Sequence, residues 1–425
     1  MGGLLFGLVA VCFAVGVPIA VALGLATAAT AGVSGSFGPE VVPQQIFNSL
    51  NSFPLMAIPF FILAGFLMQS GGLSEKLIGL GSALVGHLTG GLAMVVVITS
   101  MFFAAISGSG AATTAAIGSI MIPAMVARGY NVRFATANQA ASGALGIIIP
   151  PSIPLILYAI SAQVSVGDMF LAGIIPGLFV AFSLLVAAYV ISRVRGYKGV
   201  GRQDIRELFR SFRGALLALL MPLMVLGGIY GGVFTPTEAA VTAVVYSLFV
   251  GMVVYRKIKI KDLVGIFTKA SITTAIVMIV IGTAGLFGFL INRLGIPADI
   301  ADLFEAMDLN VFAFIIIVNV LLLITGMFIE AAAAILILVP ILLPVAMSLG
   351  IDPVHFGIIM VVNLAIGLIT PPVGINLFVA AQIANLKIET VSKAILPFVL
   401  ILFIDVLVLS LIPAMSTWLP TILNF

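Results

Sequence analysis

Two stretches of the chain decide its fold: residues 105–151, AISGSGAATTAAIGSIMIPAMVARGYNVRFATANQAASGALGIIIPP, and residues 326–372, GMFIEAAAAILILVPILLPVAMSLGIDPVHFGIIMVVNLAIGLITPP. The second stretch repeats the pattern of the first without a gap, at one constant offset. The aligned positions are Pro123 with Pro344, Gly129 with Gly350, Ser142 with Asn363, Gly146 with Gly367, and Pro150-Pro151 with Pro371-Pro372. An ungapped register that pairs two Pro-Pro steps indicates an internal duplication.

The composition is that of a polytopic membrane protein. Hydrophobic residues make up 62% of the 425 residues and charged residues only 8%, whereas a soluble domain carries about 25% charged residues. The single Cys12 excludes an internal disulfide and a multi-cysteine metal site. No Lys or Arg precedes Lys76, so we expect the first apolar stretch to be retained rather than cleaved as a signal peptide. The basic residues lie beside apolar spans and indicate topology, so we expect a lipid bilayer and no nucleic acid as partner.

Nine stretches are candidate membrane spans, because a crossing needs roughly 20 apolar residues. They are residues 4–31, 53–69, 135–162, 169–191, 215–230, 238–254, 271–291, 356–384 and 395–412. The first is either one long span or two short ones hinged at residues 16–18.

Two further apolar regions are interrupted in the middle and predict re-entrant helical hairpins at 88–127 and 311–347. The interruptions are the sequences ISGSG, at 106–110, and GMFIE, at 326–330. Half of the first region, residues 92–105, would be about 21 Å long as a helix, whereas the hydrocarbon core is about 30 Å thick. Each half therefore stops short of the far side of the membrane.

The positions of Lys and Arg predict two repeats of opposite orientation, residues 1–192 and 214–425, joined by a cytoplasmic basic loop at 193–213. With this topology the first hairpin opens inward and the second outward, an inverted repeat typical of secondary transporters. Two short, more polar segments precede the hairpins, at 73–85 and 297–308. We expect them to be arm helices lying along the membrane interface.

Two of the spans, 135–162 and 356–384, are predicted to belong to broken helices, 133–162 and 354–386, interrupted at 146–154 and 367–374. Broken backbone is tolerated in a membrane only where it faces protein or a water-filled cavity, and proline frees a carbonyl group one turn back. Freed carbonyls, hydroxyls and a carboxylate are the oxygen ligands that hard cations prefer, and transporters hold Na⁺ in this way.

Pairing each hairpin tip with a break predicts two Na⁺ sites. The first is made of Ser107, Gly108, Ser109, Gly146 and Pro150, and the second of Gly326, Glu330, Gly367, Thr370 and Pro371. The alternatives are plain tight turns and packing kinks.

Glu330 is the most informative single residue of these sites. A carboxylate near the centre of the bilayer costs about 2.5–3.5 kcal/mol, and the aligned residue in the first repeat is Ser109. The duplication therefore does not require an acid here, and we expect Glu330 to be a cation ligand or a proton-coupled switch. Glu238 fits a helix N-terminus instead, and Asp405 has no partner that the sequence identifies.

Substrate contacts are expected where the second helix of each hairpin points its positive N-terminus at the midplane, because an anion is favoured there. The polar candidates are Ser109, Ser142, Ser152, Asn363 and Thr370. The alternative for these side chains is hydrogen bonding between helices. His87 and His355 lack ligand spacing, so we expect Na⁺ but no transition metal and no organic cofactor. No phosphate-binding loop is present either.

Taken together, the motifs resemble the large membrane subunit of TRAP (tripartite ATP-independent periplasmic) transporters. They are AIPFF at 57–61, SGSG at 107–110, IIPPS at 148–152, FTPTEAA at 234–240 and TPPVG at 370–374. The resemblance implies Na⁺-coupled import of an organic acid anion, such as a C4-dicarboxylate or sugar acid, across a bacterial inner membrane. It further implies a small four-helix membrane subunit and a periplasmic substrate-binding protein as partners, and an elevator mechanism with a scaffold and a transport domain. The alternatives are a stand-alone divalent-anion/Na⁺ symporter and an intramembrane hydrolase using Ser109 or Glu330.

Overall fold

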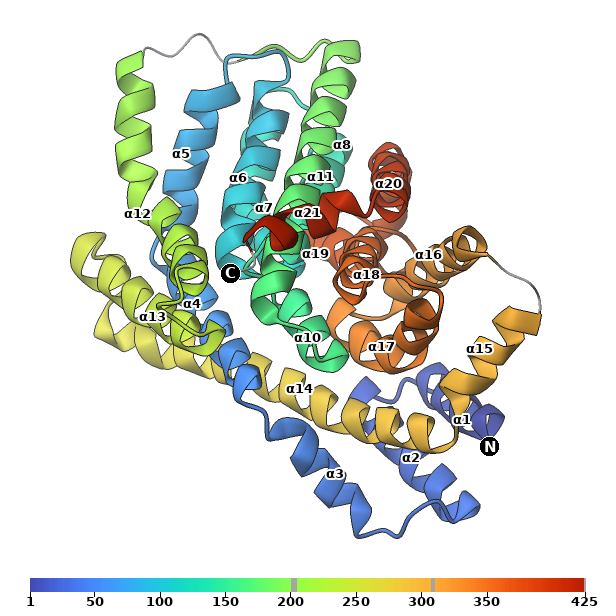
Figure 1. The fold of residues 1–425 in the computed structure, drawn as a ribbon. Helices are drawn as coiled ribbons and strands as arrows, with labels where there is room; N and C mark the ends of the chain where they lie inside the picture. Colours follow the sequence, from blue (N-terminus) through green and yellow to red (C-terminus); the bar gives the residue numbers. More distant parts are fainter. Residues whose placement is uncertain (200–204, 307–309, 424–425) are drawn as a thin grey trace.

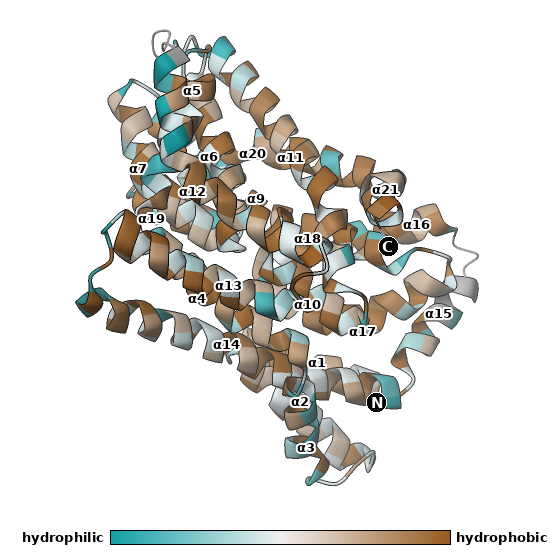
Figure 2. Ribbon diagram, turned by 60° about the vertical axis from the view of Figure 1, so that its left-hand side comes forward, coloured by the Kyte–Doolittle hydropathy of each residue, from teal (hydrophilic) through white to brown (hydrophobic). Residues whose placement is uncertain are grey.

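The computed structural model describes residues 1–199, 205–306 and 310–423. Every regular element in these three ranges is a helix, and ten helices are long and apolar enough to cross a membrane. Figure 2 shows apolar residues along the lengths of the helices and hydrophilic residues gathered at their ends. The prediction of an all-α polytopic membrane protein is confirmed. Part of the predicted basic loop, residues 200–204, lies outside the described residues.

The predicted first span is two helices. A turn with Gly16 at φ 82° separates α1 (Gly2–Ala14) from α2 (Ile19–Ser34), and Pro18 precedes α2. The short helix α3 (Val41–Leu50) was not predicted, because polar residues such as Gln44 and Gln45 interrupt its apolar run. It packs against α14 (Ile260–Arg293), as α2 does.

A frame of long helices surrounds the two hairpins. With 34 residues, α14 is about 51 Å long, and in Figure 1 it crosses obliquely below the upright helices. It contacts α4 (Ala57–Ser70) as well as α2 and α3. The other long or terminal helices are α4 (Ala57–Ser70), α11 (Val166–Val194), α12 (Ile205–Tyr230), α13 (Pro236–Phe249), continued by a π-helical turn at Val250–Val254, α20 (Ile388–Leu411) and α21 (Ala414–Leu423).

The two segments predicted as arm helices are helical. α5 (Leu73–Val85) occupies the predicted range, and α15 (Ile296–Ala306) covers most of 297–308, whose last residues lie outside the described part. However, α5 runs alongside α12 and the first hairpin helix rather than across their ends (Figure 1). Leu73, Leu77 and Leu80 are buried along one side of α5, so lengthwise packing against neighbouring helices covers this apolar stripe. The position of α5 relative to the membrane interface stays a prediction.

Both predicted hairpins are present, with longer arms than expected. The first consists of α6 (Gly91–Ser107) and α7 (Gly110–Ala127), and the second of α16 (Val311–Phe328) and α17 (Ala331–Ser348). Their 17 or 18 residues make each arm about 26 Å long, so arm length alone does not prevent a crossing. Each turn is only two residues. Ser107 and Gly108 of the first tip are buried, whereas the second tip carries the exposed Glu330, and each hairpin contacts the broken helix of its own repeat.

Both predicted broken helices are interrupted, close to the predicted positions. The first consists of α8 (Val132–Gly143), the short α9 (Leu145–Ile148) and α10 (Ile153–Ala162), and the second of α18 (Pro353–Gly367) and α19 (Ile375–Ile383). The peptide bonds Pro150-Pro151 and Pro371-Pro372 are cis. Gly146 and Gly367 are still helical, so the interruptions proper are residues 149–152 and 368–374.

Two acidic residues outside the hairpins have structural partners. Glu238 forms a capping box at the start of α13: the Thr235 N–H donates to Glu238 Oε2 at 2.8 Å, and the Glu238 N–H donates to Thr235 Oγ1 at 3.3 Å. This confirms the helix N-terminus interpretation, with Thr235 as the cap. Asp405 lies buried in α20, where its Oδ1 accepts a hydrogen bond of 2.8 Å from Ser183 Oγ of α11.

A glycine pair joins the second hairpin to the second broken helix. A Cβ on Gly326, in α16, would lie 3.0 Å from the Cα of Gly367 and 3.3 Å from the carbonyl oxygen of Leu364. A Cβ on Gly367 would in turn meet the Gly326 backbone. Gly326 is therefore a packing position inside a helix and not part of the tip, which corrects the predicted turn at 326–330.

We predict that Gly367→Ala destabilises the protein by about 1–3 kcal/mol, because the new methyl group overpacks against backbone that cannot rotate away. The measurement is the midpoint of thermal unfolding of detergent-purified protein. Gly265→Ala is the matched control, since Gly265 is also helical and has open space around its Cα. Equal midpoints for the two variants would contradict the close contact.

Candidate functional site

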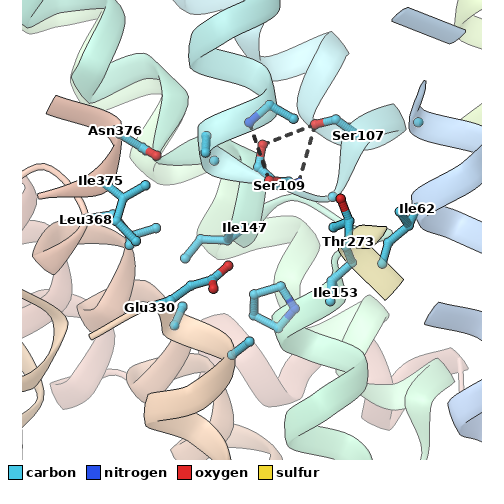
Figure 3. Close-up of a pocket in the computed structure, with 18 of the residues that line it drawn as sticks. Ile62, Ser107, Ser109, Ile147, Ile153, Thr273, Glu330, Leu368, Ile375 and Asn376 are labelled. Atoms are coloured by element: carbon cyan, nitrogen blue, oxygen red, sulfur yellow. Dashed lines mark hydrogen bonds between the residues drawn. The ribbon is translucent and has the colours of Figure 1, made fainter. Parts of the chain in front are cut away.

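A cavity of about 120 Å³ lies where the hairpins and broken helices meet α4 and α14. Its walls include the first hairpin tip from Ser107 to Ala112, the start of α17, and parts of both interruptions. Gln69 of α4 and Thr273 of α14 complete the polar lining. Figure 3 shows side chains from both repeats pointing into this space. The structure thus brings the duplicated motifs together at one place.

The first hairpin tip is bonded to the first broken helix. Gly108 ends α6 in the left-handed conformation with φ 59°, and its carbonyl oxygen accepts a hydrogen bond of 3.3 Å from the Ile153 N–H. A Cβ on Gly108 would lie 3.1 Å from the Pro151 carbonyl oxygen. Glycine is required here both by the backbone angle and by this close approach.

Beside this tip is a cluster of oxygen atoms. Ser107 Oγ lies 2.7 Å from Thr113 Oγ1 and 3.3 Å from the Ser109 carbonyl oxygen, and Thr113 Oγ1 donates to that carbonyl at 2.9 Å. Gly146 of α9 packs directly on the Ser109 carbonyl, and a Cβ there would lie 2.7 Å from Thr113 Oγ1. Two hydroxyls and a carbonyl form the kind of donor set that a hard cation binds. The predicted pairing of the SGSG tip with the first break is geometrically present, and Thr113 is an additional member that the sequence analysis did not select.

The second tip differs from the first. It consists of Ile329 and Glu330 in extended conformation, and the Glu330 side chain accepts no capping hydrogen bond from the first turn of α17. The carboxylate is exposed and points into the cavity (Figure 3). Among the described residues it has no hydrogen bond or ion pair. Thr370 and Pro371 do not line the cavity, so Glu330 faces the space shared by both repeats rather than these two members of its predicted site.

Most of the predicted substrate ligands hydrogen-bond locally. Only Ser109 lines the cavity. Ser142 Oγ donates to the Asn138 carbonyl, Ser152 Oγ to the Ile147 carbonyl and Thr370 Oγ1 to the Ile366 carbonyl, each within 2.7 Å. Asn363 donates to the carbonyl and side-chain oxygens of Asn319, which links α18 to α16. For these four residues the geometry favours the alternative, hydrogen bonding within and between helices.

Asn376 is a cavity residue that the sequence analysis missed. It lies in the first turn of α19, is fully buried, and has no hydrogen-bond partner for either amide atom among the described residues. Its aligned residue in the first repeat is the apolar Leu155, so alignment of the two repeats gave no reason to select Asn376. The available signal was an isolated Asn two residues after the TPPVG motif.

This arrangement can be compared with known proteins. A family model described as "Tripartite ATP-independent periplasmic transporter, DctM component" matches residues 6–415. The chain belongs to this family. The predicted resemblance is therefore confirmed, and the chain is a large permease component of a TRAP transporter.

Curated members of the DctM family match over most of the chain. The isethionate TRAP transporter permease protein DctMQ of Oleidesulfovibrio alaskensis is 48% identical, over 96% of this chain and 65% of that protein. The C4-dicarboxylate TRAP transporter large permease protein DctM of Pseudomonas aeruginosa is 44% identical over 92% of this chain and 93% of its own. The sialic acid TRAP transporter large permease protein SiaM of Vibrio cholerae is 38% identical over 99% and 98%.

A solved structure supports the fold. The Alcanivorax borkumensis YdaH transporter superposes with a TM-score of 0.61. The match covers 87% of this chain and 86% of that chain, at 18% sequence identity.

The relatives are named as transporter permeases, so the intramembrane hydrolase alternative is discarded. Family membership and the ten apolar helices place the chain in the bacterial inner membrane as a multi-pass protein.

We predict that Ser107→Ala raises the Na⁺ concentration needed for half-maximal uptake by roughly tenfold, because it removes one oxygen of the cluster beside the first tip. Thr113→Val should act in the same direction. Ser119→Ala is the matched control, since its hydroxyl, also on α7, bonds its own helix and does not line the cavity. A Na⁺ titration in proteoliposomes checks this, and unchanged curves for both cluster variants would favour a plain tight turn.

Proposed function

We propose that this permease imports an organic acid anion by coupling its movement to Na⁺. The observation that carries the proposal is the convergence of opposite electrostatic features on one cavity. The unpaired carboxylate of Glu330 and the oxygen cluster around Ser107 attract cations, whereas the N-terminus of α7, which begins at Gly110, attracts anions.

Electrostatics explains why the two ligands would bind together. An anionic substrate beside the Glu330 carboxylate is repelled, by about 4 kcal/mol for unit charges 4 Å apart at an effective dielectric constant of 20. A Na⁺ ion held by Glu330 or by the oxygen cluster removes this penalty. Substrate and cation therefore increase each other's affinity, and this reciprocity is what a coupled transporter needs.

The relatives indicate the class of substrate. Their printed names specify isethionate, C4-dicarboxylates and sialic acid, all of them small organic anions with a carboxylate or sulfonate group. By analogy, we infer that this chain carries an anion of the same class. A stand-alone divalent-anion symporter has no specific support from these relatives, whose names all include TRAP.

We further propose an elevator mechanism. The cavity has two kinds of wall, the hairpins and broken helices on one side and α4 and α14 on the other. Gly65 of α4 approaches the first tip closely, since a Cβ there would lie 3.5 Å from the Ser107 carbonyl oxygen. A binding site at the boundary between two bodies is exposed alternately when one body slides against the other.

The partners follow from the tripartite architecture in the family name. We propose that a small membrane subunit and a periplasmic substrate-binding protein complete the transporter. The test is uptake of radiolabelled substrate into proteoliposomes. We expect activity only when all three components are present, and uptake by this chain alone would support the stand-alone symporter.

We predict that Glu330→Gln raises the Na⁺ requirement for uptake at least about tenfold with little loss of folded protein, because the neutral amide is a weaker cation ligand. The measurement is initial uptake against Na⁺ concentration in the reconstituted three-component system. Glu389→Gln is the matched control, because Glu389 is exposed at the start of α20 and remote from the cavity lining. An identical Na⁺ titration for Glu330→Gln and wild type would remove Glu330 from the cation site.

A further inference from the structure

We infer that Asn376 and the first turn of α7 form the subsite that binds the oxyanion group, carboxylate or sulfonate, of the transported substrate. The inference rests on the proposed function and adds a residue and a place to it. It starts from a buried side chain with unused hydrogen-bonding capacity that lies against a helix N-terminus in the cavity wall.

The first turn of α7 has free donors. The first N–H groups of a helix have no partner within the helix. At this tip Ser109 Oγ accepts from the Ala112 N–H at 3.4 Å, which leaves Gly110 and Ala111 as the free donors of the turn among the described residues. Both line the cavity. α7 has 18 residues, so its dipole adds positive potential at the same point.

The Asn376 amide lies directly against this turn. A Cβ on Gly110 would lie 2.9 Å from Asn376 Nδ2 and 3.0 Å from Oδ1, and Figure 3 shows the amide pointing toward the tip. The side chain is 0% exposed and both amide atoms lack a partner in the described part of the chain. Buried polar groups are rarely left unpaired, so the amide needs a ligand or an ordered water.

Comparison of the two repeats indicates that this ligand is the substrate. Asn376 corresponds to Leu155, which is also fully buried and is tolerated at the same place in the first repeat. Packing therefore does not require an amide. The position carries one only in the repeat where it meets the α7 N-terminus, and an Asn NH₂ donates to an oxyanion in the same way as the two backbone N–H groups.

Glu330 places the proposed cation site in the same cavity as the anion subsite. It is the one charged side chain among the described residues lining the cavity, and it lies on the opposite hairpin. The oxyanion at Asn376 and a cation at Glu330 would neutralise each other across the cavity. Loss of the Asn376 amide is thus expected to weaken anion binding directly, whereas loss of the Glu330 carboxylate changes the Na⁺ requirement.

The test measures anion binding to the purified full chain by its thermal stabilisation, with sodium isethionate and sodium succinate as probes and sodium chloride at equal Na⁺ as reference. We expect at least one probe to stabilise wild type, and Asn376→Leu to weaken the apparent affinity by about tenfold or more. Asn376→Asp should weaken it further through charge repulsion. Gln382→Leu, which removes an exposed amide from the same helix, should bind like wild type.

Gly110→Ala provides an independent variant, because its methyl group would press on the Asn376 amide without removing it. We expect weaker anion binding again, while the unfolding midpoint without probe reports any loss of stability. The inference is overturned if neither probe stabilises wild type, or if Asn376→Leu binds the probe as tightly as wild type. The second result is expected if an ordered water, and not the anion, pairs with the Asn376 amide. Na⁺-dependent uptake by the complete transporter tests the proposed function separately, so each can fail alone.

Discussion

The structure depends on one constraint: a main chain interrupted inside a membrane must pair its N–H and C=O groups with protein or turn them to a polar cavity. Both interruptions meet this requirement by contacting the hairpin of their own repeat. The Ile153 N–H donates to the Gly108 carbonyl, and the Gly374 N–H donates to the Met327 carbonyl at 3.4 Å. Hairpin tips and breaks are therefore mutually dependent, and the polar groups that remain define the cavity.

Glycine makes these contacts possible because it lets two main chains approach without intervening side chains. Gly146 packs on the Ser109 carbonyl, and Gly326 packs on Gly367. The result is a cavity wall that includes backbone oxygens and N–H groups. Such groups do not lose rotamer freedom on binding, and the helices on either side hold them in place.

The two repeats share their packing residues but differ in the polar residues that line the cavity. Positions that pack, such as Gly146 and Gly367, are the same in both repeats. The polar cavity residues occur where the repeats differ: Glu330 is aligned with Ser109, and Asn376 with Leu155. A single cavity shared by two copies needs each charge or amide only once, and a second carboxylate facing the same cavity would be repelled by the first.

Hydropathy, Gly and Pro determined the all-α architecture, the two hairpins, the two interrupted helices and the bounds of α5, since these signals act within a few residues. Pairing the first tip with the first break also followed from the sequence. The lengthwise packing of α5, the arm lengths of the hairpins and the existence of α3 depend on which helices pack together. The same is true of the site: Thr113 joins Ser107, Asn363 bonds Asn319, and Asn376 faces Gly110. These pairs lie on separate helices or adjacent turns, so only tertiary structure decides which polar groups satisfy each other and which remain free for a ligand.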